Sequence, residues 1–153
     1  MLLLVFRLGD DRFALDSGRI VEVLPLVSVK RALGAPAGIR GTFRYRGRFV
    51  AAVDLSERLL GRPAEQRLGT RVVLATIAGE SGPLLLGLIV ENATETIRCD
   101  PAQIVPPAIA SSQRPWLGAM IVDADGPVQL IDVDQLLASD VRRSLAAATA
   151  EVA

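Results

Sequence analysis

The chain has 153 residues, 17 of them basic and 17 acidic, so its formal net charge is zero, and half of its residues are hydrophobic. It contains no histidine and a single cysteine, Cys99. These counts exclude Ser-His-Asp and Cys-His catalysis, His-ligated metal sites, Cys₄ zinc sites and an internal disulfide. A neutral chain also lacks the long-range attraction of a basic protein for nucleic acid or anionic membranes. We expect a folded domain without a metal or cofactor.

No segment is predicted to enter a membrane. The apolar run 1–6 ends at Arg7, which makes it shorter than the apolar region of a signal peptide, and no basic region precedes it. A membrane-spanning helix needs about 20 apolar residues, and the longest uncharged run, 101–113, is interrupted by prolines. We therefore expect a cytoplasmic protein with no direct membrane insertion.

The first half of the chain reads as short apolar runs separated by turn signals. This pattern predicts strands at 2–8, 13–15, 20–24, 42–45 and 49–53. A short helix is predicted at 54–60, with Asp54 or Ser56 as its N-cap and Gly61 followed by Pro63 at its end. The polar stretch 62–69 is typical of a linker.

The second half continues in the same way. Strands are predicted at 71–77, 84–90, 93–98, 117–122 and 128–131. Asp134 is predicted to cap a helix that carries Leu137, Val141 and Leu145 on one face, and the alanine-rich end of the chain is typical of a frayed helix. Many short strands with little helix indicate an all-β sandwich or barrel.

The two halves resemble each other. The segments 54–59 and 132–137 each follow a hairpin with a glycine in its turn, and each hairpin begins after another glycine, Gly41 or Gly118. One interpretation is two similar small barrels in tandem, in which Gly41, Gly118, Asp54 and Asp132 have structural roles in turns and caps. The other is that β-hairpins with glycine turns look alike by chance.

Three candidate reactive sites each have a simpler structural interpretation, which we favour. Asp123-x-Asp125-Gly126 suggests a calcium loop, but an Asp-Gly hairpin turn fits its surroundings better. Asp132 and Asp134 suggest an acid/base pair, but a capping or barrel-closing role is simpler. Cys99 is interpreted as a packed residue rather than a reactive thiol.

An arginine cluster surrounds the turn between the strands predicted at 42–45 and 49–53. Its members are Arg40, Arg44, Arg46 and Arg48, interleaved with Phe43, Tyr45 and Phe49. One interpretation is a solvated hairpin. A second is a protein interface, since arginine binds carboxylates through its two-pronged guanidinium. A third is a single-stranded nucleic-acid site that combines base stacking with phosphate contacts.

Motifs that span nearly the whole chain, from Phe6 to Leu137, carry a family likeness. In chain order they are Phe13-Ala-Leu15, Ile20-Val-Glu22-Val23, Pro36-x-x-Ile39-x-Gly41, Arg46-Gly47-x-x-Val50, Val53-Asp54-Leu55, Leu84-Leu-Leu-Gly87-Leu-Ile-Val90-Glu91, Ile104-x-Pro106, Leu117-Gly118 and Leu130-Ile-Asp132. Each motif alone is unspecific, but the ordered series resembles the CheW-type coupling proteins of bacterial chemosensory systems.

The resemblance implies an all-β fold of two five-stranded SH3-like barrels, with a short linking helix and a C-terminal helix. The CheW-like domain would cover 1–138, followed by a helical or frayed tail at 139–153. The first barrel would span about 13–56, and the second about 70–133 together with the N-terminal strand, 1–8.

The resemblance also implies a non-catalytic adaptor. Such proteins bind the regulatory domain of a CheA-type histidine kinase and the cytoplasmic tip of methyl-accepting chemoreceptors, which would recruit this chain to membrane-bound receptor complexes. The expected partner-binding residues are Arg44, Arg46 and Gly47 at the arginine-rich turn, together with the apolar Val23, Ile39, Val50 and Val53.

The sequence departs from the family pattern at two positions. Arg44 stands where the family usually has asparagine, and Ala51 stands near the usual proline before Val53-Asp54-Leu55. These departures indicate a specialised paralogue, with surface sensing, pilus motility or cyclic-di-GMP production among its possible outputs.

Overall fold

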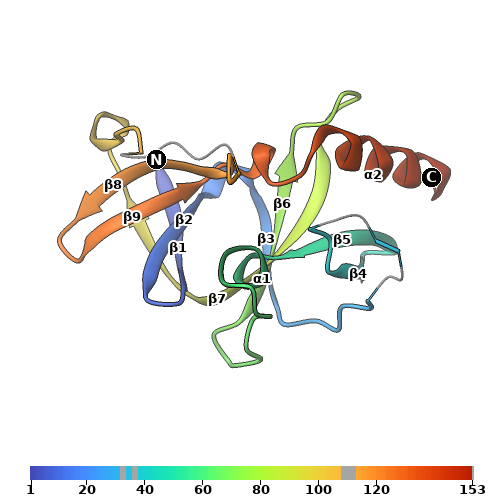
Figure 1. Cartoon of the computed structure of the whole chain (residues 1–153), viewed down its shortest axis with the longest axis horizontal. Coiled ribbons are helices and arrows are strands. Elements are labelled where there is room, and N and C mark those ends of the chain that lie inside the picture. The colour runs from blue at the N-terminus through green and yellow to red at the C-terminus, as the bar shows by residue number, and fades with distance from the viewer. Residues whose placement is uncertain (32–33, 36–37, 108–112, 153) are drawn as a thin grey trace.

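The computed structural model describes residues 1–31, 34–35, 38–107 and 113–152, and its strands form two barrels that share one long strand (Figure 1). The strands are β1 (Leu2–Leu8), β2 (Asp11–Asp16), β3 (Ile20–Pro25), β4 (Gly41–Tyr45), β5 (Arg48–Asp54), β6 (Arg71–Ile77), β7 (Leu84–Arg98), β8 (Leu117–Asp123) and β9 (Gly126–Ile131). The described residues also form two α-helices, α1 (Leu55–Leu60) and α2 (Ser139–Val152). They form three 3₁₀ turns as well, η1 (Ser17–Arg19), η2 (Pro101–Gln103) and η3 (Val133–Gln135). The all-β prediction is confirmed.

Each barrel contains five strands and is closed by one isolated bridge. In the first barrel the neighbours are β3, β6, the first half of β7, β5 and β4. The bridge between Lys30 and Thr42 joins the segment after β3 to β4. In the second barrel the neighbours are the second half of β7, β1, β2, β9 and β8. The bridge between Val105 and Met120 closes it in the same way.

The barrels are not consecutive along the chain, because the two halves exchange hairpins. The β1–β2 hairpin belongs to the second barrel and pairs with β7 and β9, whereas β6 and the start of β7 complete the first barrel. This corrects the expected barrel boundaries at 13–56 and 70–133, which place β2 in the first barrel and β6 in the second. The expectation that the N-terminal strand joins the second barrel agrees with the pairing of β1.

Strand register supports the internal repeat. The parallel pair Ala52–Gly87 joins β5 to β7, and the parallel pair Ala14–Leu130 joins β2 to β9. Ala14 therefore corresponds to Gly87, and Ala52 to Leu130, so each half contributes equivalent residues to both barrels. The tandem arrangement expected from the sequence is thus an intertwined one.

Strand β7 is a single strand, although the sequence predicts two. Its irregularity lies at Asn92, whose φ of 50° is in the left-handed region that asparagine tolerates better than most residues. The pairing of β1 with β7 also changes register between Val5 and Arg7. The strand therefore bends without ending, and passes directly from one barrel to the other.

The hydrophobic core has three parts, because strands of a double barrel bury both faces. One set lines the first barrel: Phe43, Val50, Ala52, Val72, Leu74 and Ile89. Another lines the second barrel: Leu3, Val5, Ala14, Cys99, Ile121 and Val128. The largest lies between the barrels and includes Phe6, Phe13, Val53, Leu88 and Trp116. Successive residues of β5 thus alternate between two buried environments, as side chains of a strand do.

The predicted linking helix is confirmed, whereas the expected C-terminal cap is wrong. Asp54 caps α1, and Gly61 ends it with a φ of 75°. At the other end Asp132 caps η3, and α2 begins only at Ser139. Asp134 caps no helix because its carboxylate is bound by Arg19. No helix in the described part of the chain is long and apolar enough to cross a membrane.

Candidate functional site

The β4–β5 hairpin, which we call the first hairpin, has a two-residue turn formed by Arg46 and Gly47. Their φ angles of 48° and 78° are both positive, as a type I′ turn requires. Glycine adopts this conformation freely, whereas arginine does so at a cost in conformational energy. The turn therefore projects the Arg46 side chain from the tip of the hairpin.

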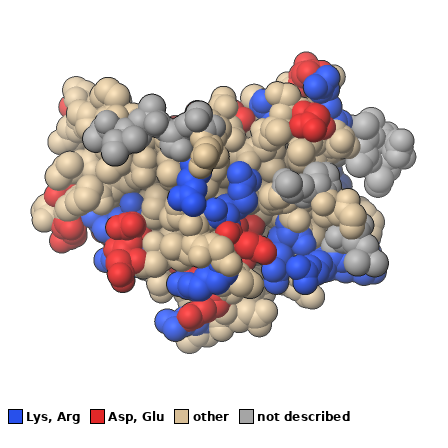
Figure 2. Space-filling model, in the orientation of Figure 1, with Lys and Arg blue, Asp and Glu red and all other residues tan. Residues whose placement is uncertain are grey.

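Three arginines of the first hairpin are exposed and have no ion pair within the described residues: Arg44, Arg46 and Arg48. The guanidinium of Arg44 lies 5.6 Å from the centre of the Phe49 ring, its direct cross-strand partner. That of Arg46 lies 5.3 Å from the Tyr45 ring. Basic side chains accordingly gather over β4 and β5 at the right of Figure 2. The surface suits an acidic partner.

Tyr45 ties the turn end of the first hairpin to β3. Its hydroxyl donates to Glu22 Oε2 at 2.5 Å. This hydrogen bond, together with burial, raises the pKa of the Tyr45 phenol. Because Glu22 lies on β3, the bond connects β3 to the first hairpin, in addition to the closing bridge at Lys30. The hairpin is thus held in one orientation.

Two of the predicted apolar partner-binding residues are exposed enough to take part, and two are not. Val23 is 42% exposed on β3, and Ile39 is half-buried against the core between the barrels. Val50 is 3% exposed and Val53 is fully buried. The prediction that Val50 and Val53 supply contact surface is therefore wrong, because β5 buries both of its faces.

Phe49, expected beside the arginines but not among the partner-binding residues, is 62% exposed at the first hairpin. The signal was present, since Phe49 precedes the inward-facing Val50 and neighbours in a strand point to opposite faces. Arg40, in contrast, lies apart from the unpaired arginines and pairs with Glu57 at 3.3 Å. The predicted cluster of four therefore contains three arginines free to bind a partner.

The predicted turn and cap residues have structural roles. A Cβ atom on Gly41 would lie 2.1 Å from the carbonyl oxygen of Lys30, so only glycine lets the closing bridge form. At Gly118, a Cβ would lie 3.1 Å from Leu130 O. Asp54 is buried and accepts hydrogen bonds from the backbone amides of Glu57 and Ala64. Burial raises the pKa of the Asp54 carboxyl.

Asp123 and Asp134 are committed to ion pairs rather than chemistry. Asp123 accepts two hydrogen bonds from the buried Arg12, at 2.7 and 2.9 Å, which lower the pKa of Asp123. Asp134 is bound by both terminal guanidinium nitrogens of Arg19, and its pKa is also lowered. Neither geometry resembles a calcium loop or an acid/base pair.

Cys99 is buried in the core of the second barrel, and its thiol contacts the carbonyl oxygen of Asp100 at 3.3 Å. It is therefore a packing residue, in agreement with the favoured interpretation. No group of three or more acidic or cysteine side chains in the described residues is placed to hold a metal ion.

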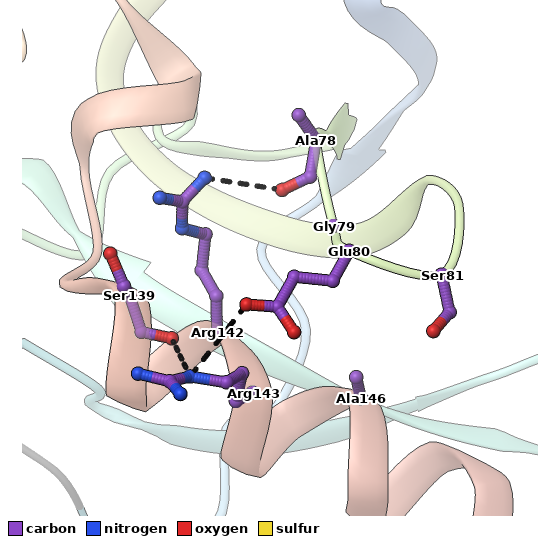
Figure 3. Close-up of a pocket in the computed structure, with 8 residues that line it drawn as sticks. All are labelled: Ala78, Gly79, Glu80, Ser81, Ser139, Arg142, Arg143 and Ala146. Carbon is purple, nitrogen blue, oxygen red and sulfur yellow. Dashed lines mark hydrogen bonds and ion pairs between the residues drawn. The ribbon is translucent and has the colours of Figure 1, made fainter.

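A hollow of about 450 Å³ lies between α2 and the turn that joins β6 to β7 (Figure 3). Arg142 donates to the carbonyl oxygen of Ala78 at 3.3 Å, and Arg143 pairs with Glu80 at 3.8 Å. These contacts hold α2 against the turn. Because both arginines are already engaged, we place the candidate site at the first hairpin.

Comparison with known proteins identifies the family. The model of the CheW-like domain matches residues 2–141. The chemotaxis protein CheW of Rhizobium meliloti is 24% identical over 93% of this chain and 90% of that protein. Protein FrzA of Myxococcus xanthus is 27% identical over 92% of this chain and 88% of that protein.

A solved structure shows the same fold. The scaffolding protein TtCheW from Thermoanaerobacter tengcongensis matches with a TM-score of 0.78 and 24% identity, covering 90% of this chain and 87% of that one. The likeness supports two SH3-like barrels. With a family match over nearly its whole length, the chain belongs to the CheW-like domain family.

Proposed function

We propose that this protein is a non-catalytic adaptor of a chemosensory system that couples methyl-accepting chemoreceptors to a CheA-type histidine kinase. The observation that carries the proposal is the CheW-like match over residues 2–141. In this role the protein works in the cytoplasm and is recruited to membrane-bound receptor complexes. Signalling requires only that receptor and kinase states differ in their affinity for the adaptor.

The first hairpin is the proposed kinase contact. It offers three unpaired arginines, and Arg46 is displayed by a turn that Gly47 makes possible. Arginine binds carboxylates through two parallel hydrogen bonds, which give both strength and orientation. The exposed ring of Phe49 adds apolar surface beside this charge. An interface with an apolar centre and charged rim is typical of specific protein contacts.

Val23 and Ile39 are proposed to add apolar surface at a second contact, with the receptor tip. Val21, two residues before Val23 on β3, is 50% exposed, and Val23 pairs with Val73, a residue of the core between the barrels. Exposed valines bordering a buried core continue its apolar surface outward. The two proposed contacts therefore use different strands of the first barrel.

Calorimetric titration with the regulatory domain of the CheA-type kinase encoded nearest the gene tests the kinase contact. We expect saturable binding that weakens in Arg46→Asn. Asparagine suits the left-handed turn conformation and creates the Asn-Gly pair preferred in type I′ turns, so the variant removes the charge without harming the fold.

Arg98→Gln is the matched control, because it removes an exposed arginine at the end of β7, in the second barrel and outside the first hairpin. Binding that is unchanged in Arg46→Asn would remove the first hairpin from the kinase contact. Absence of binding to this or any other kinase of the same cell would contradict the adaptor role. Salt-dependent retention of single-stranded oligonucleotide would then favour a nucleic-acid site at the same arginines.

A further inference from the structure

The contacts that hold α2 against the first barrel leave one arginine incompletely paired. Arg142 donates to the carbonyl oxygen of Ala78 through a single terminal nitrogen, at 3.3 Å. Its Nε atom is buried without a hydrogen-bond partner, and no other side-chain nitrogen or oxygen in the described residues is in that position. Leaving a buried donor without a partner is unfavourable, and a bound water or ion often supplies one. The hollow beside α2 therefore favours a ligand that accepts hydrogen bonds.

Arg142 also has no carboxylate of its own. Among the described residues, no acidic side chain forms an ion pair with it. Asp134 lies within its electrostatic reach, since the hydrogen bond from Arg19 lowers the pKa of that carboxyl most and the charge of Arg142 lowers it further. Both terminal nitrogens of Arg19 and the amide of Ala78 already bind this carboxylate, however. The charge of Arg142 is therefore available to an anion from solution.

Arg143, the next residue of α2, is held only loosely. Its Nε lies 3.8 Å from Glu80 Oε1 and 3.4 Å from the carbonyl oxygen of Ser139. The side chains of Arg143 and Glu80 are 61% and 75% exposed, and exposed pairs of this kind contribute little to stability. Figure 3 shows the Glu80 side chain extending from the turn toward both arginines. A more highly charged anion can therefore displace Glu80 from Arg143.

The hollow is large enough for a phosphate group. Its volume of about 450 Å³ lies within the range of small-molecule sites, roughly 300–1,000 Å³. Arginine binds phosphate through two parallel hydrogen bonds. A phosphate group carries about two negative charges at neutral pH and several acceptor oxygens, so it can engage two guanidinium groups at once. A carboxylate has a single charge and only two oxygens. Phosphate therefore matches the two adjacent arginines better.

We propose that the hollow between α2 and the turn from β6 to β7 binds a phosphate group, either free or as part of a small organic molecule. Arg142 and Arg143 hold its oxygens, and Glu80 gives up its place beside Arg143. The bound group then connects α2 to the turn, so it fixes the helix against the first barrel. None of these residues lies in the first hairpin, and the inference does not rest on the proposed adaptor role.

Calorimetric titration of the full chain with inorganic phosphate tests this proposal, with sodium chloride at equal ionic strength as the reference. We expect saturable binding to one site, and a Tm that rises with phosphate concentration because the folded chain binds and the unfolded chain does not. Titration with glycerol 3-phosphate separates the two sources of the group. Tighter binding than that of inorganic phosphate assigns the site to an organic phosphate, and weaker binding assigns it to free phosphate. No saturable heat from either compound would overturn the proposal.

Variants of the lining residues locate the binding site. Arg142→Gln and Arg143→Gln should each weaken phosphate binding about tenfold or more, because each removes charge-assisted hydrogen bonds. Glu80→Gln should instead tighten the binding, because the competing carboxylate is gone. A pair that served only to hold α2 in place would give no such gain. Unchanged affinity in Arg143→Gln, or weaker binding in Glu80→Gln, would overturn the assignment.

Arg98→Gln is again the matched control, because it removes an exposed arginine at the end of β7 and outside the hollow. It should bind phosphate like the parent protein, and a loss of binding in it would show that net charge, and not the hollow, governs the effect. Since Arg143 and Glu80 are both exposed, their variants should keep the fold even if Arg142→Gln does not. Circular dichroism of every variant confirms the fold before the affinities are compared.

Discussion

Replacement of Gly41 by alanine should open the first barrel. The new Cβ would lie 2.1 Å from the carbonyl oxygen of Lys30, a backbone atom that cannot rotate away. That carbonyl accepts from the amide of Thr42 at 2.9 Å, and the amide of Lys30 donates to Thr42 O at 2.8 Å. Both bonds of the closing bridge must lengthen or break to relieve the clash.

The size of the effect follows from these contacts. Overpacking costs about 1–3 kcal/mol, and each backbone hydrogen bond contributes about 0.5–1.5 kcal/mol. The free energy of unfolding of Gly41→Ala should therefore fall by about 2–6 kcal/mol. With a urea m-value of about 1–3 kcal/mol per molar, the midpoint should move down by about 0.7 M or more.

Urea titration followed by fluorescence measures this change, because the buried Trp116 is the only tryptophan. Gly118→Ala is the matched control from the other half of the repeat, where the added Cβ would lie 3.1 Å from Leu130 O. The free energy of unfolding of Gly118→Ala should fall by about 1 kcal/mol or less, since a shift of a few tenths of an ångström relieves the contact. Equal midpoints for Gly41→Ala and the parent, or a larger loss in Gly118→Ala, would refute the reasoning.

Asp54→Ala should lower the free energy of unfolding by about 1–2 kcal/mol, because the carboxylate accepts two backbone amides, at 3.2 and 2.8 Å; an unchanged Tm would contradict its capping role. Gly47→Val should lower the free energy of unfolding by about 1–2 kcal/mol, because valine is strained at a φ of 78°. A free energy of unfolding equal to that of the parent, measured by chemical denaturation, would exclude the type I′ turn. Asp123→Asn should lose stability at pH 7, and it should lose less at pH 3. Its hydrogen bonds from Arg12 lower the pKa of the carboxyl. The stabilisation is therefore complete above the unfolded pKa, near 4, and is lost as the pH falls through the folded value. An equal loss at both pH values would show that the effect is not one of ionisation.

Much of the local structure was predictable from the sequence. The strand at 71–77 and the helix that follows Asp54 are marked by apolar runs, a capping carboxylate and a terminating glycine, and the structure places both as expected. The turn at Gly47 was predictable for the same reason, since its backbone conformation is set by neighbouring residues. These features depend on contacts within a few residues.

The remaining features depend on contacts distant in sequence. The Asp134 carboxylate is bound by Arg19, 115 residues away in the chain, so no local sequence pattern distinguishes Asp134 from an aspartate that caps a helix. The exchange of hairpins between barrels rests on pairing of β2 with β9, which periodicity does not encode. Val53 was expected at a partner contact, but its side chain packs in the core between the barrels, because this face of β5 meets the second barrel.

The adaptor role is tested most directly by reconstitution of the kinase, the receptor and this protein from the same cell. Autophosphorylation of the CheA-type kinase should respond to receptor ligand only when the chain is present, and the response should weaken in Arg46→Asn while Arg98→Gln behaves as the parent. A kinase that responds equally to the receptor with and without this chain would contradict the account.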